Sequence, residues 1–154
     1  MTELKHIQDF LAERRLAIVG VSRQSNNYSR VVFREFVKRG YDVIPVNPRA
    51  EEIEGKPCLA RLRDIQPPAL AVLFMTPSGT SDDLMQDCAE SGAKKVWFRR
   101  KLRHDLHSSN TLSFCKEHKV TVIDGLCPLM FLPDTESFHR FHGMLLKLFG
   151  KYPQ

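Results

Sequence analysis

Short apolar runs alternate with amphipathic stretches along this 154-residue chain. The runs at 16–21 and 70–75 are apolar throughout, which is typical of strands buried on both faces of a parallel sheet. Further runs predict strands at 41–46, 95–98 and 120–124. Five strands separated by helical stretches predict a doubly wound α/β domain whose crossover connections are right-handed.

The stretches between these strands carry apolar residues at helical spacing. They predict helices over 3–14, 30–39 and 80–91, a weaker one over 104–118, and a last one from about residue 134 onward. In the second of these helices Val32, Phe33, Phe36 and Val37 form the apolar stripe. Gly40 follows where a left-handed C-terminal cap is expected.

Proline and glycine mark the turns between these elements. Pro45 cannot donate to a sheet ladder, so we expect it near the end of strand 41–46. Asn47 and Pro48 then end that strand, and residues 54–57 predict another turn. Ligands of open α/β sheets bind at the carboxyl ends of the strands, so the loops that follow each strand are the candidate site.

Composition narrows the class of protein. Apolar residues make up 42% of the chain, enough to exclude a disordered protein, and 23 Lys and Arg against 18 Asp and Glu leave a net charge of +5. The four cysteines are widely spaced without a Cys-x-x-Cys pair, which favours reduced thiols in a cytoplasmic protein. We see no signal-peptide pattern and no apolar run long enough to span a membrane.

The loop after the first strand begins with Gly20, Val21 and Ser22 and runs through Ser29 to a helix that starts at Arg30. Glycine permits a tight turn, hydroxyls can donate to phosphate, and a helix N-terminus favours an anion. The spacing departs from Gly-x-Gly-x-x-Gly because serine stands in the second glycine's place. A pyrophosphate site and an ordinary strand-to-helix turn both remain open.

The loop after the second strand reads Asn47, Pro48, Arg49. An NAD site usually has Asp or Glu here to bind the ribose hydroxyls, so a neutral amide followed by a cation disfavours NAD. A guanidinium pairs well with a phosphate on the ribose. The alternative is that Arg49 is a solvated surface charge.

Two further strand ends complete the candidate groove. Thr76 and Pro77 follow the third strand and provide a stiff, mainly apolar wall with a hydroxyl. Phe98 and Arg99 end the fourth strand and lead into further cations at 100–101. These cations either meet phosphate or form a solvated face.

Together these segments resemble the CoA-binding domain family, the compact Rossmann-like group that is also similar to the N-terminal domain of the succinyl-CoA synthetase alpha subunit. The resemblance covers about residues 10 to 130. It rests on 18–22 (Ile-Val-Gly-Val-Ser), 40–48 (Gly-Tyr-Asp-Val-Ile-Pro-Val-Asn-Pro), 53–55, 62–65, the Pro77 loop, 92–98 and 120–124.

The resemblance implies a three-layer Rossmann-like domain with a five-stranded, mainly parallel sheet and helices on both faces. It also implies that the loop from Gly20 to Ser29 holds the CoA phosphates and that Asn47 to Arg49 hold the adenosine side. The candidate ligand-binding residues are Gly20, Val21, Ser22, Ser29, Arg30, Asn47, Pro48, Arg49, Thr76, Pro77, Phe98 and Arg99. The chain departs from the family pattern at Arg99–Lys101 and at Gly125–Cys127.

The expected function is non-catalytic binding of coenzyme A or an acyl-CoA by a domain spanning 1–133. We expect the helix over 134–154 to pack on this domain or on a partner subunit. We assign no catalytic residue, because Gly-x-Ser-x-Gly and the phosphate-loop motif are absent. We assign no metal ligand, because the pairs His104/His107 and His139/His142 lack a clear third ligand. The expected partner is a small nucleotide ligand, not nucleic acid or a membrane, and a homodimer is left open. The alternatives are an NADP-dependent oxidoreductase and a regulatory protein with a vestigial pocket.

Overall fold

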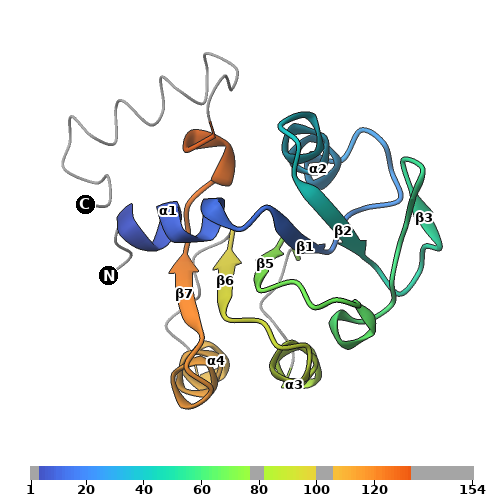
Figure 1. Cartoon of the computed structure of the whole chain (residues 1–154). Coiled ribbons are helices and arrows are strands. Elements are labelled where there is room, and N and C mark those ends of the chain that lie inside the picture. The colour runs from blue at the N-terminus through green and yellow to red at the C-terminus, as the bar shows by residue number, and fades with distance from the viewer. Residues whose placement is uncertain (1–3, 77–81, 100–105, 133–154) are drawn as a thin grey trace.

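The computed structural model describes residues 4–76, 82–99 and 106–132 (Figure 1). Pro77, the cations at 100–101 and the expected helix over 134–154 lie outside the described residues. The predicted strands and the four helices that precede residue 118 are all present, with ends that shift by a few residues.

Five parallel strands form the central sheet, in the order β2-β1-β5-β6-β7. Their bounds are Arg15–Val19 for β1, Asp42–Val46 for β2, Ala71–Phe74 for β5, Lys95–Phe98 for β6 and Thr121–Asp124 for β7. The fold expected from the sequence, a three-layer α/β domain with a five-stranded parallel sheet, is therefore confirmed.

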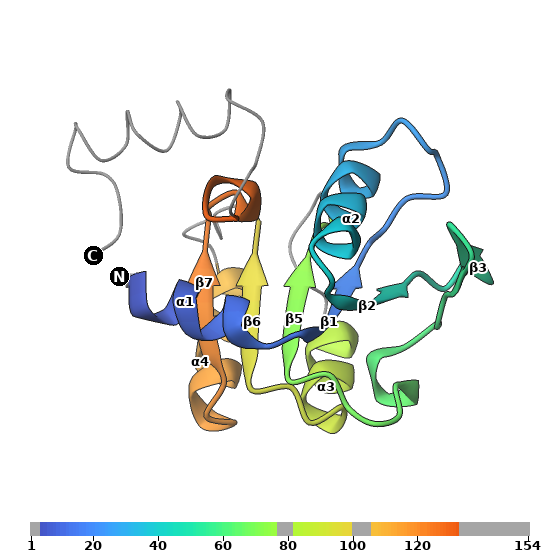
Figure 2. The same cartoon turned by 45° about the horizontal axis from the view of Figure 1, so that its top comes forward.

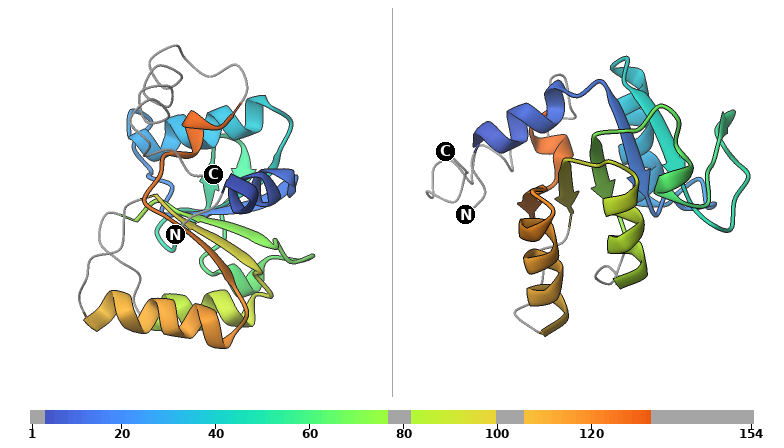
Figure 3. Two further views of the ribbon diagram at one scale, coloured as in Figure 1. Left: turned by 90° about the vertical axis from the view of Figure 1, so that its left-hand side faces the viewer. Right: turned by 60° about the horizontal axis from the view of Figure 1, so that its bottom comes forward.

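Helices cover both faces of this sheet (Figure 3). They are α1 at Leu4–Ala12, α2 at Tyr28–Lys38, α3 at Asp82–Glu90 and α4 at Leu106–Glu117. Side chains along β1 alternate between two cores: Leu16 and Ile18 pack with α1 and α2, whereas Ala17 and Val19 pack with α3 and α4. This double burial explains why the strand is apolar at every position.

Trp97 anchors the core on the α1 side. Its side chain is fully buried on β6, and its ring meets Phe10 of α1 edge-on with centroids 5.3 Å apart. Its indole Nε1 donates to the Leu126 carbonyl oxygen at 2.9 Å, just after β7. Buried indoles need such a partner, so this one residue joins the sheet, α1 and the chain that leads into the short 3-10 helix η2 at Pro128–Met130.

Pro45 is tolerated because β2 is an edge strand. The Leu59 N–H donates to the Pro45 carbonyl at 3.1 Å, and the Asn47 N–H donates to the Leu59 carbonyl at 2.9 Å. The carbonyl of residue 45 therefore points away from β1, toward the outer side of β2, where Leu59 pairs with the strand. A missing N–H costs no ladder bond there.

A small hairpin stands where the sequence indicated only a turn at 54–57. Its strands are β3 at Glu52–Ile53 and β4 at Lys56–Pro57, so the turn itself is limited to Glu54 and Gly55. Both turn residues have positive φ, +48° and +80°, as in the two-residue turns that match strand twist. Strands of two residues carry too little periodicity to be recognised from the sequence.

After the hairpin, the short 3-10 helix η1 at Leu62–Asp64 is fastened to α3. The buried carboxylate of Asp87 accepts hydrogen bonds from the backbone N–H groups of Leu62 and Arg63, at 2.7 and 3.0 Å. It also accepts one from the Arg63 Nε at 3.1 Å. One charged side chain thus satisfies the donors at the start of η1.

Candidate functional site

The carboxyl ends of all five strands lie at one edge of the sheet (Figure 2). The chain leaves β1 toward β2 on one side and returns to β5 on the other side of β1. Crossovers that diverge in this way open a crevice at the strand ends, the usual ligand position in such folds. The loops singled out in the sequence converge on this edge.

Gly20 draws three strand ends together. Its φ is +88°, and its N–H donates to the carbonyl of Val46 at the end of β2, at 3.0 Å. A Cβ at this position would lie 3.1 Å from both Cγ2 and the backbone nitrogen of Thr76, just after β5. Only glycine meets both the backbone angle and the close approach.

Hydrogen bonds among residues 22–29 fix the loop from Ser22 to Asn27. The Ser22 N–H donates to the Ser29 Oγ at 2.9 Å, and the Ser22 Oγ accepts from the Gln24 N–H at 3.1 Å. Asn27 caps α2, because its Oδ1 accepts from both the N–H and the hydroxyl of Ser29. Ser29 is buried, so in this structure its hydroxyl holds the loop, and Ser22 is the more exposed of the two serines.

Asn47 connects the first two loops of the site. Its Nδ2 donates to the Val21 carbonyl at 2.8 Å, and its Oδ1 accepts from the Arg49 N–H at 2.8 Å. Val21, Asn47 and Arg49 therefore lie on the same side of the molecule. The Arg49 side chain is exposed and forms no ion pair with the residues that the structure describes.

Arg30 is buried behind the first loop. Its Nη1 donates to the carbonyl oxygens of Ser22 and Arg23, both at 3.2 Å, and its Nε donates to the Glu54 carboxylate at 3.0 Å. Arg34, one turn later in α2, donates to the other Glu54 oxygen at 2.8 Å. Arg30 is a candidate ligand-binding residue predicted from the sequence, whereas Arg34 and Glu54 are not, because no local pattern links the hairpin to α2.

Burial by itself would raise the pKa of Glu54. The hydrogen bonds and positive charges of Arg34 and Arg30 outweigh that effect and hold its pKa below the ordinary 4.5. The carboxylate is therefore ionised at neutral pH and forms a charged junction between the hairpin and α2.

At the other end of the edge, Arg99 lies over Tyr28. Its guanidinium carbon is 4.4 Å from the centre of the Tyr28 ring, a cation–π geometry. The Tyr28 hydroxyl oxygen is 2.8 Å from the Cys127 Sγ. Burial, with the hydrogen bond and charge of Cys127, raises the pKa of Tyr28, so it stays protonated. Phe98 points elsewhere: its buried ring stacks on Phe74 in the core with α3 and α4.

Three of the cysteines are buried thiols. Burial raises the pKa of Cys88 to about 12 and that of Cys115 to about 11, and it also raises the pKa of Cys58. Cys127 is only half-buried and lies beside Tyr28 at the Arg99 end of the candidate site, whereas the Cys58 Sγ donates to the Asn47 carbonyl at 3.7 Å. Among the described residues, no group of three His, Cys, Asp or Glu side chains is arranged to hold a metal ion.

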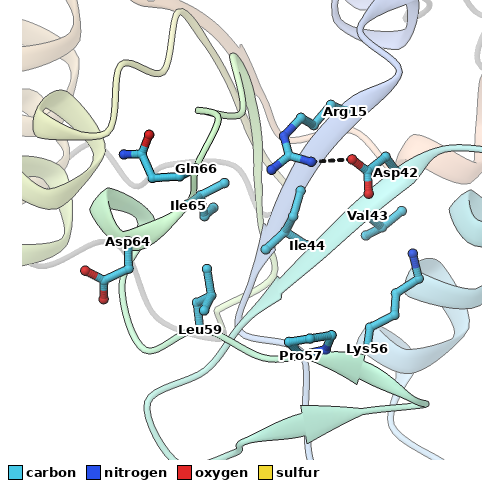
Figure 4. A pocket seen from close by; sticks show the side chains of 10 residues that line it. All are labelled: Arg15, Asp42, Val43, Ile44, Lys56, Pro57, Leu59, Asp64, Ile65 and Gln66. Atoms are coloured by element: carbon cyan, nitrogen blue, oxygen red, sulfur yellow. Dashed lines mark hydrogen bonds and ion pairs between the residues drawn. The ribbon is translucent and has the colours of Figure 1, made fainter.

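A cavity of about 390 Å³ lies away from this edge, beside β2 (Figure 4). Its rim includes the ion pair between Arg15 and Asp42, the first residues of β1 and β2, and its wall includes Ile44 and Ile65. None of the sequence-predicted ligand residues lines it. Within the described part of the chain, no helix is both long and apolar enough to cross a bilayer.

Known proteins of similar length match most of this chain. The uncharacterized protein YneT of Bacillus subtilis is 28% identical over 114 residues, covering 74% of this chain and 82% of that protein. A conserved hypothetical protein from Pyrococcus furiosus matches with a TM-score of 0.63 at 27% identity, covering 74% of this chain and 95% of the other.

The crystal structure of Prb, the PH1109 protein redesigned for binding, matches with a TM-score of 0.72. It covers 95% of this chain and 93% of that one, and at 23% identity it shows the shared fold. The sequence profile of the CoA binding domain matches residues 14–133, which include all five strands and every candidate residue. The chain therefore belongs to the CoA-binding domain family.

Proposed function

We propose that this protein binds coenzyme A or an acyl-CoA along the carboxyl edge of its sheet. The observation that carries the proposal is the family profile over residues 14–133, which spans the loops that meet at Gly20. Four interstrand steps separate β2 from β7, a width of about 19 Å, which suits a long ligand lying across the strand ends.

Each part of the edge suits a different part of CoA. The Ser22–Asn27 loop offers the diphosphate the Ser22 hydroxyl and the N–H groups of Arg23 and Asn26, which have no hydrogen-bond partner among the described residues. Arg49 is exposed beside Asn47 and is free to pair with the 3′-phosphate of the ribose. The pantetheine arm then passes Thr76 toward the Arg99 end of the groove.

We also propose that the ligand is held without being turned over. Arg30, the buried cation behind the groove, is engaged in a structural ion pair with Glu54. The raised pKa values of Tyr28 and of the buried thiols keep these groups protonated and poorly nucleophilic. Incubation with acetyl-CoA and analysis by mass spectrometry should leave the thioester intact, and its hydrolysis above a protein-free blank would contradict this part of the proposal.

Calorimetric titration tests the proposed ligand. Wild-type protein should bind CoA more tightly than dephospho-CoA, NADP or NAD. Because one charge-assisted phosphate contact at an exposed site contributes about 1.5 kcal/mol, the preference over dephospho-CoA should be about tenfold. Tighter binding of NADP than of CoA would instead favour the oxidoreductase alternative.

Arg49→Gln should bind dephospho-CoA as the wild type does and lose the preference for CoA. Lys94→Gln is the matched control, because Lys94 is an exposed cation at the amino end of β6. This variant should retain the full preference. If Arg49→Gln retains it too, the ribose phosphate is held elsewhere.

A further inference from the structure

We propose that Glu54, on the tip of the β3–β4 hairpin, is a positioning residue that holds the phosphate-binding loop in its ligand-binding shape. This inference rests on the proposed function and adds the hairpin to the site. Glu54 lies in segment 53–55, one of those that carry the family resemblance, but it is not among the candidate ligand-binding residues. Its carboxylate pairs with Arg30 and Arg34, and these two arginines contact the loop.

The two arginines set the direction of the loop's peptide groups. Arg30 Nη1 donates to the carbonyls of Ser22 and Arg23, and Arg34 Nη2 donates to the carbonyl of Ser25 at 3.0 Å. In a trans peptide the N–H of the next residue points opposite to the carbonyl. The N–H groups of residues 23, 24 and 26 therefore point away from the guanidinium groups.

Two of these N–H groups are available to a ligand. The Gln24 N–H donates to the Ser22 Oγ, whereas those of Arg23 and Asn26 have no hydrogen-bond partner among the described residues. Both residues are exposed. Backbone N–H groups that a loop turns to one side form concave donor sites for phosphate, and the Arg23 and Asn26 N–H groups, three positions apart, are the two that this loop leaves open. The arginine pair and Glu54 together retain one net positive charge behind them.

Glu54 has an unfavourable backbone conformation at the tip of the hairpin. Its φ is +48°, a left-handed conformation that asparagine and glycine adopt more readily than glutamate at this turn position. Strain of this kind persists where the surrounding structure requires the side chain. Here the requirement is a carboxylate long enough to reach Arg30 Nε at 3.0 Å and Arg34 Nε at 2.8 Å.

Three variants separate positioning from folding and from charge. Glu54→Gln keeps the length and removes the charge, and Glu54→Asn relieves the backbone strain but is too short to reach the arginines. Glu52→Gln is the charge control, because Glu52 lies on the same hairpin and forms no ion pair with the described residues. Its field effect on CoA binding at physiological ionic strength is about twofold or less.

We expect calorimetric Kd values for CoA to rise about tenfold in both Glu54 variants and to stay within twofold of wild type in Glu52→Gln. Glu54→Asn loses the stability of the two ion pairs but is relieved of the φ of +48°, so it should remain fully folded in the absence of urea, and its lost affinity is then not loss of folding. Unchanged or tighter CoA binding in both Glu54 variants would overturn the proposal, the tighter result showing that Glu54 competes with the ligand.

Nuclear magnetic resonance distinguishes this failure from failure of the proposed function. In wild type, the Arg23 and Asn26 amides should have order parameters of about 0.85, and their resonances should shift when inorganic pyrophosphate is added. In Glu54→Gln the order parameters should fall below about 0.6 and the shifts should be lost. If wild type does not bind CoA, the order parameters of these two amides still test the positioning role. A fall in Glu54→Gln supports that role, and order parameters equal to those of wild type refute it.

Discussion

Replacing Gly20 with alanine tests how closely the ends of β1 and β5 approach each other at the candidate site. Two costs combine at this position. The φ of +88° is unfavourable for any residue with a Cβ, by about 1–2 kcal/mol. The new Cβ would also lie 3.1 Å from Cγ2 and from the backbone nitrogen of Thr76, and a backbone atom cannot move away cheaply.

Gly55→Ala is a matched control for the first cost alone. Gly55 has nearly the same φ, +80°, but nothing lies within 4 Å of a Cβ built there. Alanine restricts the unfolded chain and so recovers about 0.4–1 kcal/mol in both variants. We therefore expect Gly55→Ala to cost about 1 kcal/mol, and Gly20→Ala to cost about 1–3 kcal/mol more from overpacking.

Urea unfolding followed by fluorescence measures this difference directly, since the single tryptophan, Trp97, is fully buried. Adding Thr76→Ser to Gly20→Ala removes the Cγ2 contact and should restore part of the loss, while the contact with the backbone nitrogen remains. If both glycine variants unfold within about 0.5 kcal/mol of each other, the close approach carries no energy and the reasoning is refuted.

Other predictions concern buried charge, pH and thiol reactivity. Asp87→Ala leaves buried N–H donors of η1 unpaired and should cost about 3 kcal/mol, lowering Tm by about 6–12 °C, whereas the exposed Asp83→Ala should change little. The pKa of Glu54 is lowered on folding, so its ion pairs contribute stability above pH 4.5 that is lost as pH falls through the folded pKa. Urea titrations should show the stability difference between wild type and Glu54→Gln shrinking over that acid range, and a constant difference would contradict the assignment. Alkylation of the native protein at mildly alkaline pH should modify Cys127 before Cys88 and Cys115, because burial raises the pKa of the latter two to about 12 and 11; peptide mass spectrometry would reveal a different order.

The sequence alone predicted the elements that carry strong local signals. Residues 16–19 became a strand buried on both faces because every one of them is apolar. Gly20 and Asn47 were predicted as turn residues at the carboxyl ends of β1 and β2, because glycine and asparagine directly after an apolar run are strong turn signals. The hairpin around Glu54 and Gly55 was missed because its strands have two residues each.

Only the tertiary structure decided what the polar side chains near the site contact. Arg30 and Glu54 are 24 positions apart, and no spacing rule relates a helix start to a hairpin tip. The same holds for Tyr28 and Cys127, which are separated by 99 positions and meet at the strand ends. Apolar periodicity is a property of neighbouring residues and can be read along the chain. The direction of a charged side chain depends on which distant segment supplies its partner, and that is settled only when the sheet and its crossovers have formed.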